Sequence, residues 1–491
     1  MSLNILLIRP NLCIRKGFDL QNRFYPPLGL VYLAAALLPE GHHVEILDMV
    51  SEAPDTKWEF RGTHVCYGMT DEALAERIAD SNPRIIGITG FTSQHARIVE
   101  IVSKIKVGFP DITVVLGGIH PTALPNMMME QSGADFVILG EGETSFTRLA
   151  SAVETGDQEQ IRRIDGLVYR HGERIEINPK TSFSRDLDSI PLPARELLPN
   201  TAYLEHEVSM PVITSRGCPY SCVFCCVSLL QGQRWRARSP EHVVDEVELI
   251  VNRWGYKTVA MFDDAFNVIP ERVERICKEI IRRGLKINVV VPSSLMIKHL
   301  TRDTLYWLRQ AGCSAVVLPF EHSDEKIRNT IINKGLTTEQ FDKVLDWCRE
   351  LELLAMVNLV IGLPGETEET LQSLDRYVAE NAFRMDALTV YIGTPFPGTR
   401  FFEECLEKGY LHNPQENDFL DFDLYKCVIN TPWLSADTVD RYRQSIENTF
   451  TTLRTPHFDN ALIRRAVRKP DAEASDYINT VYLKKRLQIG G

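Results

Sequence analysis

From residue 4 to about residue 150, short runs of apolar residues alternate with longer amphipathic segments. The apolar runs are rich in β-branched residues, are bounded by proline, glycine or aspartate, and cover residues 4–8, 44–47, 85–88, 113–116 and 136–139. Helical spacing marks segments between them, such as residues 28–38 and 95–107. Continuous apolar strands that alternate with helices are typical of a parallel sheet covered on both faces. We therefore predict a doubly wound, Rossmann-like α/β domain over residues 1–150.

The loops that follow three of these strands are polar or rich in glycine. They contain Thr89, Thr92 and Ser93, then Gly117 and Gly118, then Gly140 and Glu141. Ligands of open parallel sheets bind at the carboxyl ends of the strands. A single loop of this kind could simply contain glycines that turn the chain. Three such loops after successive strands favour a ligand-binding site at this edge of the sheet.

A second alternating series lies further along the chain. Residues 151–205 read as a connector with a hairpin formed by residues 166–169 and 174–178. Six apolar runs with helical segments between them then follow, at residues 212–215, 258–262, 288–291, 315–320, 356–361 and 387–391. Six strand–helix units predict a partial (β/α)6 barrel over residues 206–400. Residues 401–491 have helical spacing and mixed charge, which predicts a mostly helical C-terminal region.

Composition narrows the classes of protein. The chain has 491 residues, of which 44% are hydrophobic and 24% are charged, the ordinary balance of a globular protein. The formal net charge of −12 is opposite to that of a protein that neutralises phosphates. We therefore expect no nucleic acid as a main partner, and a cationic small molecule fits the charge better.

The eleven cysteines are unevenly spaced. Cys218, Cys222, Cys225 and Cys226 crowd together, while the others are scattered singly, unlike the dense framework of a secreted disulfide protein. No apolar run approaches the ~18 residues of a membrane span, and the first residues read as a strand, not as a signal peptide. These features predict a cytoplasmic protein with one local cluster of thiolates.

The cysteine cluster has the spacing C-x3-C-x2-C at Cys218, Cys222 and Cys225, directly after a predicted strand. A structural zinc site usually has four ligands in two separated pairs, and no second pair with that spacing is present. A fully thiolate-ligated 4Fe–4S cluster also needs four cysteines. Three cysteines leave one iron without a protein ligand, which suits a cluster that binds a substrate or cofactor there.

This motif, with the aromatic Phe224 before its last cysteine, resembles that of the radical S-adenosylmethionine enzymes. Further segments with the family's pattern follow later strands: Phe262-Asp263-Asp264, Glu321-His322-Ser323 and Gly362-Leu363-Pro364-Gly365-Glu366. The resemblance implies a 4Fe–4S cluster on the three cysteines and S-adenosylmethionine as cofactor. It assigns the contacts to S-adenosylmethionine to Phe224, Asp263, Asp264, Ser293, Glu321, Ser323 and Gly362. After the third strand the sequence has Ser293 and Ser294 where many relatives have an arginine.

The first 150 residues resemble the cobalamin-binding domain of the cobalamin-dependent members of this family. The segments that match are Tyr25-Pro26-Pro27-Leu28-Gly29, Gly117-Gly118-Ile119-His120-Pro121 and Gly140-Glu141-Gly142-Glu143. The resemblance implies cobalamin contacts by Thr89, Thr92, Ser93, Gly117, Gly118, Gly140 and Glu141. The Asp-x-His-x-x-Gly motif of other cobalamin domains is missing after the first strand, so that loop offers no histidine to cobalt. A vestigial domain that binds no cobalamin is the alternative.

The resemblance implies an enzyme that methylates an unactivated centre of a small metabolite, with an electron donor such as flavodoxin or ferredoxin. A radical cyclase, ring-contracting enzyme or dehydratase that transfers no methyl group is the alternative, for example one acting on an aminosugar or a porphyrin-type substrate. A non-catalytic sensor is a third class, but no DNA-binding motif supports it. The sequence identifies no residue that deprotonates the substrate. Asp418, Asp421, Asp423 and Tyr425 are either substrate contacts or part of a solvated acidic stretch.

Overall fold

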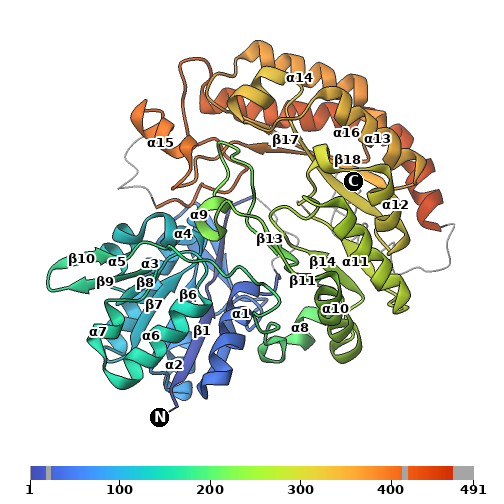
Figure 1. Cartoon of the computed structure of the whole chain (residues 1–491). Helices are drawn as coiled ribbons and strands as arrows, with labels where there is room; N and C mark the ends of the chain where they lie inside the picture. Colours follow the sequence, from blue (N-terminus) through green and yellow to red (C-terminus); the bar gives the residue numbers. More distant parts are fainter. Residues whose placement is uncertain (1, 18–23, 293, 412–417, 468–491) are drawn as a thin grey trace.

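The computed structural model describes residues 2–17, 24–292, 294–411 and 418–467. A sheet domain built from the first part of the chain lies beside a half-barrel built from the middle part, and C-terminal elements lie along both (Figure 1). Ser293, one of the residues expected to contact S-adenosylmethionine, lies outside the described residues.

The N-terminal sheet has the strand order β10-β9-β8-β7-β6-β1-β3 within the described residues. Its parallel strands are β1 (Asn4–Arg9), β3 (His43–Asp48), β6 (Ile85–Thr89), β7 (Thr113–Gly117) and β8 (Phe136–Ile138). The hairpin β9 (Leu167–His171) and β10 (Arg174–Ile177) joins them antiparallel at β8. The predicted strands and the hairpin are confirmed. Since the hairpin completes this sheet, the sheet extends beyond residue 150.

Helices cover both faces of this sheet, because successive strand residues point in opposite directions. Ile5 and Leu7 pack in a core with α1 (Leu28–Leu37) and α6 (Glu143–Thr155). Leu6 and Ile8 pack in a second core with apolar residues of α2 (Asp71–Ser81), α3 (His95–Gly108) and α5 (Pro125–Ser132). The doubly wound α/β prediction is confirmed.

A small antiparallel sheet, which the sequence pattern did not reveal, stands beside this domain. It has the order β2-β5-β4, with β2 (Leu12–Arg15), β5 (His64–Tyr67) and β4 (Lys57–Phe60). Cys13 on β2 lies opposite Cys66 on β5, and the two form a disulfide. These two cysteines, which are scattered singly in the sequence, are therefore paired in the fold. A sequence separation of 53 residues gave no sign that the two strands are neighbours.

The second series of strands forms the predicted half-barrel. One parallel sheet contains β11 (Met210–Val212), β14 (Thr258–Met261) and β15 (Asn288–Val290), and another contains β16 (Ala315–Glu321), β17 (Leu354–Ile361) and β18 (Ala387–Ile392). A parallel bridge between Val291 and Val316 joins the two sheets. The outer helices are α10 (Pro240–Trp254), α11 (Pro270–Arg282), α12 (Arg302–Gln310), α13 (Thr338–Glu350) and α14 (Glu368–Asn381).

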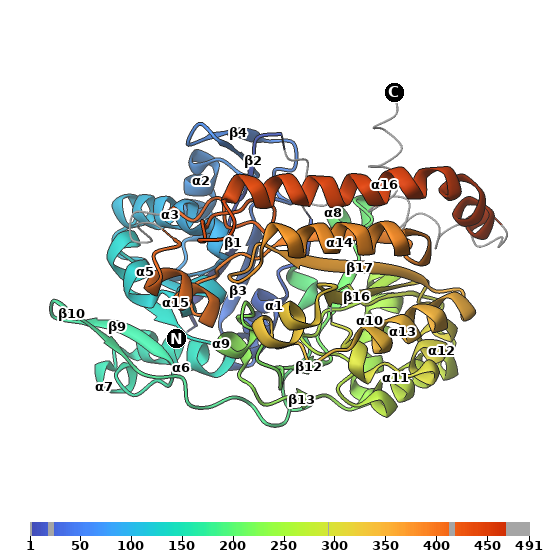
Figure 2. The same ribbon diagram turned by 90° about the horizontal axis from the view of Figure 1, so that it is seen from above.

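The C-terminal part contains α15 (Arg400–Glu407) and the long α16 (Ala436–Val467), which runs beside α14 (Figure 2). Between them, an acidic segment returns to the small sheet. Arg15 on β2 bonds Asp421 at 3.0 Å and Asp423 at 2.7 Å. These two carboxylates are therefore partners of an arginine and not simply solvated. In the described part of the chain, no helix has the length and apolarity that a bilayer crossing needs.

Candidate functional site at the cysteine loop and the domain interface

The cysteine loop begins at a turn that only glycine fits well. Gly217 has φ +80°, and a Cβ there would lie 2.6 Å from the Arg234 carbonyl oxygen. The loop leaves the short strand β12 (Ser215–Arg216), which pairs antiparallel with β13 (Arg236–Ala237). The Gly217 N–H donates to Gln231 Oε1 at 3.0 Å and to Asp264 Oδ2 at 3.2 Å. The start of the loop is thus fixed from two sides.

The middle of the loop is held by the opposite side of the half-barrel. Val223 N donates to the Ile332 carbonyl oxygen at 3.1 Å, and Phe401 N donates to the Val223 carbonyl oxygen at 3.2 Å. Asn333 Nδ2 donates to Ser221 Oγ at 2.9 Å. The segment after β16 and the first turn of α15 therefore shape the loop together.

The three motif cysteines are electrostatically close to one another. Cys218 is buried, while Cys222 and Cys225 are partly buried. Burial raises the pKa of each thiol, to about 12 for Cys225, and the neighbouring cysteines add to the rise for Cys218 and Cys225. Among the described residues, no three histidine, cysteine, aspartate or glutamate side chains converge as the ligands of a single ion would. A cluster places its thiolates on different irons, so this arrangement fits a cluster better than mononuclear zinc.

Two lysines, Lys334 and Lys298, lie beside this loop. The Lys334 ammonium forms a buried ion pair with Glu321 at 2.6 Å, and its charge opposes the rise in the pKa of Cys222. Lys298 acts on Cys222 in the same direction and lies 3.6 Å from the centre of the Tyr220 ring. Both cations suit a site for anionic groups.

The described residues that are expected to bind S-adenosylmethionine have different surroundings. Phe224 is half-buried and packs against the main core. Asp263 is buried, and its two oxygens accept hydrogen bonds from the backbone and hydroxyl groups of Thr214 and Ser215. Asp264 lies one residue further, and burial raises its pKa to about 6. Its position beside Gly217 leaves it the better placed of the two carboxylates for a ligand at the loop.

The carboxyl end of β16 has polar atoms that lack partners. In the described structure, Ser323 Oγ and His322 Nε2 are buried without a hydrogen-bond partner. Glu321, immediately before them, has φ +71°, a left-handed conformation that is uncommon for glutamate. An orphaned hydroxyl beside a carboxylate fits a polar ligand such as the methionine part of S-adenosylmethionine. Gly362, with φ +87°, packs near Val439 of α16, and its N–H donates to Glu366 at 2.9 Å.

Five residues expected to contact cobalamin lie at or just after the carboxyl ends of β6 and β7. Thr89 and Gly117 end these strands, and Gly118 has φ +90° with Thr89 Oγ1 only 2.7 Å from where a Cβ would lie. Thr92 is buried, and Ser93 is partly buried beside it in the turn η2 (Thr92–Gln94). Gly118 therefore serves a close approach between two loops, whereas a Cβ at Gly117 would make an ordinary contact, at 3.8 Å from the Ile138 carbonyl oxygen.

Gly140 and Glu141 face the half-barrel. Gly140 has φ +67°, and a Cβ there would lie 3.2 Å from the carbonyl oxygen of Leu230 in α9 (Val227–Gln231). Glu141 bonds Arg236 through both of its oxygens, at 2.6 and 3.1 Å. Its carboxylate is therefore engaged by the barrel, which is a different partner from the cobalamin that the sequence suggested.

A cavity of about 370 Å³ lies between the two domains. From the sheet domain it is lined by Arg9, Tyr25, Thr89, Phe91 and Gln94, among others, and from the half-barrel by Ser209, Pro211, Ala260, Phe262 and Pro292. Phe91 and Phe262 are unusually exposed for large aromatic side chains, at 52% and 54%. Ser209 Oγ is buried without a hydrogen-bond partner in the described structure. The cavity thus has aromatic walls from both domains and an unpaired hydroxyl, which fits the edge of a corrin ring or an apolar substrate.

Comparisons with known proteins agree with this geometry. Residues 22–150 match the B12 binding domain family, and residues 212–378 match the Radical SAM superfamily. An uncharacterized methyltransferase of Pyrococcus horikoshii is 30% identical over 79% of this chain and 80% of its own length. An anaerobic magnesium-protoporphyrin IX monomethyl ester cyclase of Cereibacter sphaeroides is 26% identical over 85% of this chain and 70% of its own.

Among solved structures, the radical S-adenosylmethionine methyltransferase TsrM of Kitasatospora setae, with cobalamin and a [4Fe-4S] cluster bound, has a similar fold. The TM-score is 0.66 at 23% identity, covering 84% of this chain and 76% of that one. A cobalamin-type sheet domain joined to a half-barrel with a three-cysteine loop defines an iron–sulfur enzyme. This chain belongs to the cobalamin-dependent radical S-adenosylmethionine enzymes. Membership implies a 4Fe–4S cluster, S-adenosylmethionine and cobalamin as cofactors, and a reductant and a substrate as partners.

Proposed function

We propose that this enzyme transfers a methyl group to an unactivated centre of a small molecule. The observation that carries the proposal is the cavity of about 370 Å³ that opens to the strand ends of both domains. A methyl acceptor in this cavity would touch the cobalamin domain and the half-barrel at once. The similarity to a methyltransferase over most of the chain supports the same reaction.

The chain's own residues bind and position the reactants. Cys218, Cys222 and Cys225 would hold the cluster, and Asp264, Glu321 and Ser323 would bind S-adenosylmethionine beside it. When bound, the three cofactors supply an electron, an adenosyl radical and a methyl group. Phe91 and Phe262 line the cavity from the two domains and would contact an apolar acceptor bound between them.

The cavity indicates which acceptor fits. Among the described residues that line it, Arg9 is the charged one, and it is buried and paired with Asp48 at 2.8 Å. No described lining residue is acidic, so the cavity offers no carboxylate to the cationic substrate that the net charge suggested. We propose a small acceptor with a planar, apolar part that accepts or donates one hydrogen bond at Ser209. The reductant is a low-potential electron carrier such as flavodoxin or ferredoxin.

The test uses anaerobically loaded protein, S-adenosylmethionine labelled in its methyl group, and a panel of planar small molecules. Methyl transfer predicts labelled product together with 5′-deoxyadenosine, and neither in Cys222→Ala. A product that forms without label would overturn the proposal.

Radical cyclisation is a second candidate, because the cyclase relative matches 85% of this chain. The same experiment separates the two reactions. A cyclised product has no added carbon and carries no label, although 5′-deoxyadenosine still forms.

A further inference from the structure

Two arginines lie directly opposite each other on the ribbon that carries the cysteine loop. Arg216 on β12 and Arg236 on β13 are register partners, and Arg216 precedes Gly217 and Cys218. Like charges opposite each other destabilise a strand pair. Both side chains are nearly fully buried, at 6% and 4% exposure, so their charges need partners of opposite sign.

The negatively charged partners of the two arginines belong to the N-terminal sheet domain. Arg216 bonds Glu143 at 2.6 Å and lies 3.6 Å from Glu141. Arg236 is held by both oxygens of Glu141. The two carboxylates sit between β8 and the first turn of α6, so the sheet domain supplies two negative charges that balance the two arginines of the ribbon.

From Glu141, hydrogen bonds continue to the first residue of the cysteine loop. Arg236 donates to the Gln231 carbonyl oxygen at 2.8 Å, and Gln231 Oε1 accepts from the Gly217 N–H at 3.0 Å. The path therefore runs from the β8–α6 loop through Arg236 and Gln231 to the residue before Cys218. Gly140 strengthens the contact, because only a residue without a side chain allows its close approach to Leu230 of α9.

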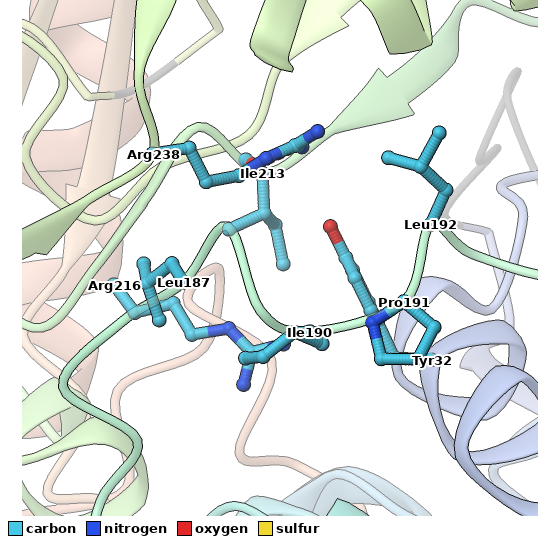
Figure 3. A pocket seen from close by; sticks show the side chains of 8 residues that line it. All are labelled: Tyr32, Leu187, Ile190, Pro191, Leu192, Ile213, Arg216 and Arg238. Carbon is cyan, nitrogen blue, oxygen red and sulfur yellow. Dashed lines mark hydrogen bonds between the residues drawn. The ribbon is translucent and has the colours of Figure 1, made fainter.

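Arg216 also contacts an aromatic ring of the sheet domain. Its guanidinium lies 4.9 Å from the centre of the Tyr32 ring, which belongs to α1 of the sheet domain. Figure 3 shows Tyr32 and Arg216 among the side chains that line a small cavity. The cavity measures about 10 Å³, roughly the space of one water molecule. Arg216 is thus enclosed by groups of the sheet domain on two sides.

We propose that Glu141 and Glu143 are positioning residues that act through Arg236 and Arg216 to hold the cluster loop at a fixed place relative to the cobalamin domain. Neither carboxylate touches a reacting atom. Their effect on coupling between the two cofactor sites rests on the proposed function, whereas their effect on the loop itself does not.

The test compares Glu141→Gln, Glu143→Gln and the double variant with Asp135→Asn. Asp135 forms a partly buried ion pair with Lys106 in the same sheet domain, at the opposite ends of the strands. The first measurement is hydrogen exchange of residues 215–232 in the full-length, cluster-free protein. We expect the amides of this segment to exchange about tenfold faster in the double variant and to be unchanged in Asp135→Asn. Equal exchange in the two variants would overturn the proposal.

The second measurement is the ratio of 5′-deoxyadenosine to methylated product in the loaded enzyme. Misplacement of the loop should raise this ratio about tenfold, because radical formation and methyl delivery lose their alignment. A fall of both products in equal proportion would contradict a positioning role. If the wild-type enzyme forms no methylated product, the proposed function fails, while hydrogen exchange still decides this inference.

Should Glu141→Gln not fold, Arg236→Lys keeps the charge but loses the forked geometry and is measured in the same way.

Discussion

The Lys334 ammonium lies 2.6 Å from Glu321 Oε1, and both side chains are buried at the carboxyl end of β16. Glu321 holds this place with a left-handed backbone, and Lys334 follows the segment that bonds the cysteine loop through Ile332 and Asn333. The pair therefore joins the end of a barrel strand to the loop expected to carry the cluster. Because the two charges compensate each other away from water, each depends on the other.

Removal of the Lys334 ammonium should lower the free energy of unfolding. Lys334→Met leaves the Glu321 carboxylate buried without its partner, and we expect a loss of about 3–5 kcal/mol in the free energy of unfolding. Combining it with Glu321→Gln should recover part of this loss, because the unpaired charge disappears. Urea unfolding of the cluster-free protein measures both changes. The exposed Lys326→Met is the matched control, and an equally small effect of the two lysine variants would contradict the interpretation.

The cluster should depend on three cysteines and not on the fourth. Cys218→Ala, Cys222→Ala and Cys225→Ala should each abolish a 4Fe–4S cluster in anaerobically reconstituted protein, because each removes the ligand of one iron. Cys226→Ala should retain it, since Cys226 lies outside the C-x3-C-x2-C spacing and precedes α9. Iron and sulfide content measure the outcome. Full iron content in the triple variant would show that the ligands are elsewhere.

Glu366 should make stability depend on pH. Burial raises its pKa from 4.5 to about 8, and in the described structure Oε1 has no hydrogen-bond partner. Between these values the folded chain binds a proton that the unfolded chain has released. The free energy of unfolding therefore falls as pH rises, by at most about 1.4 kcal/mol per pH unit for this group. Glu366→Gln should remove this loss, so its advantage over the wild type should be small at pH 5 and largest near pH 8. A constant difference across that range in chemical unfolding would contradict the assignment.

The corrinoid state is predictable from the loop after β1. Its residues Pro10 and Asn11 include no histidine, and Asn11 is engaged by the Tyr67 and Met69 carbonyl oxygens. Protein made with cobalamin available should hold about one corrinoid per chain with a base-off absorption spectrum, because this loop offers cobalt no imidazole and a buried nucleotide tail keeps its own base away.

Gly117→Trp tests where the corrinoid enters. A Cβ at Gly117 would lie 3.8 Å from the Ile138 carbonyl oxygen, so the backbone tolerates a side chain there, and a tryptophan would occupy the space beyond this strand end. We expect folded protein without corrinoid. Gly118→Trp is less informative, since φ +90° and the nearby Thr89 hydroxyl make any side chain there disruptive. Full corrinoid content in Gly117→Trp would move the binding site away from this strand end.

The sequence revealed the parts of the fold that have continuous apolar strands. The runs at Ile5–Ile8 and Ile85–Ile88 are buried on both faces in the structure, so a strand assignment needed no knowledge of partners. The short strand Lys57–Phe60 gave no such signal, because it alternates charged and aromatic residues over four positions. The partner of Glu141 was also beyond reach, since Arg236 lies 95 residues away and only the fold brings them together. Spacing alone did predict a loop with three clustered cysteines, because these residues are close together in the chain.

The ion pairs of Arg15 with Asp421 and Asp423 join the segment before α16 to strand β2 near the N-terminus. Leu420 of the same segment packs with Cys13, Cys66 and Phe60 of the small sheet. Cleavage after residue 407 would therefore strip a covering from the N-terminal domain as well as from the half-barrel. The two family domains are not interchangeable modules, and a graft of either one onto another enzyme would have to bring this returning tail with it.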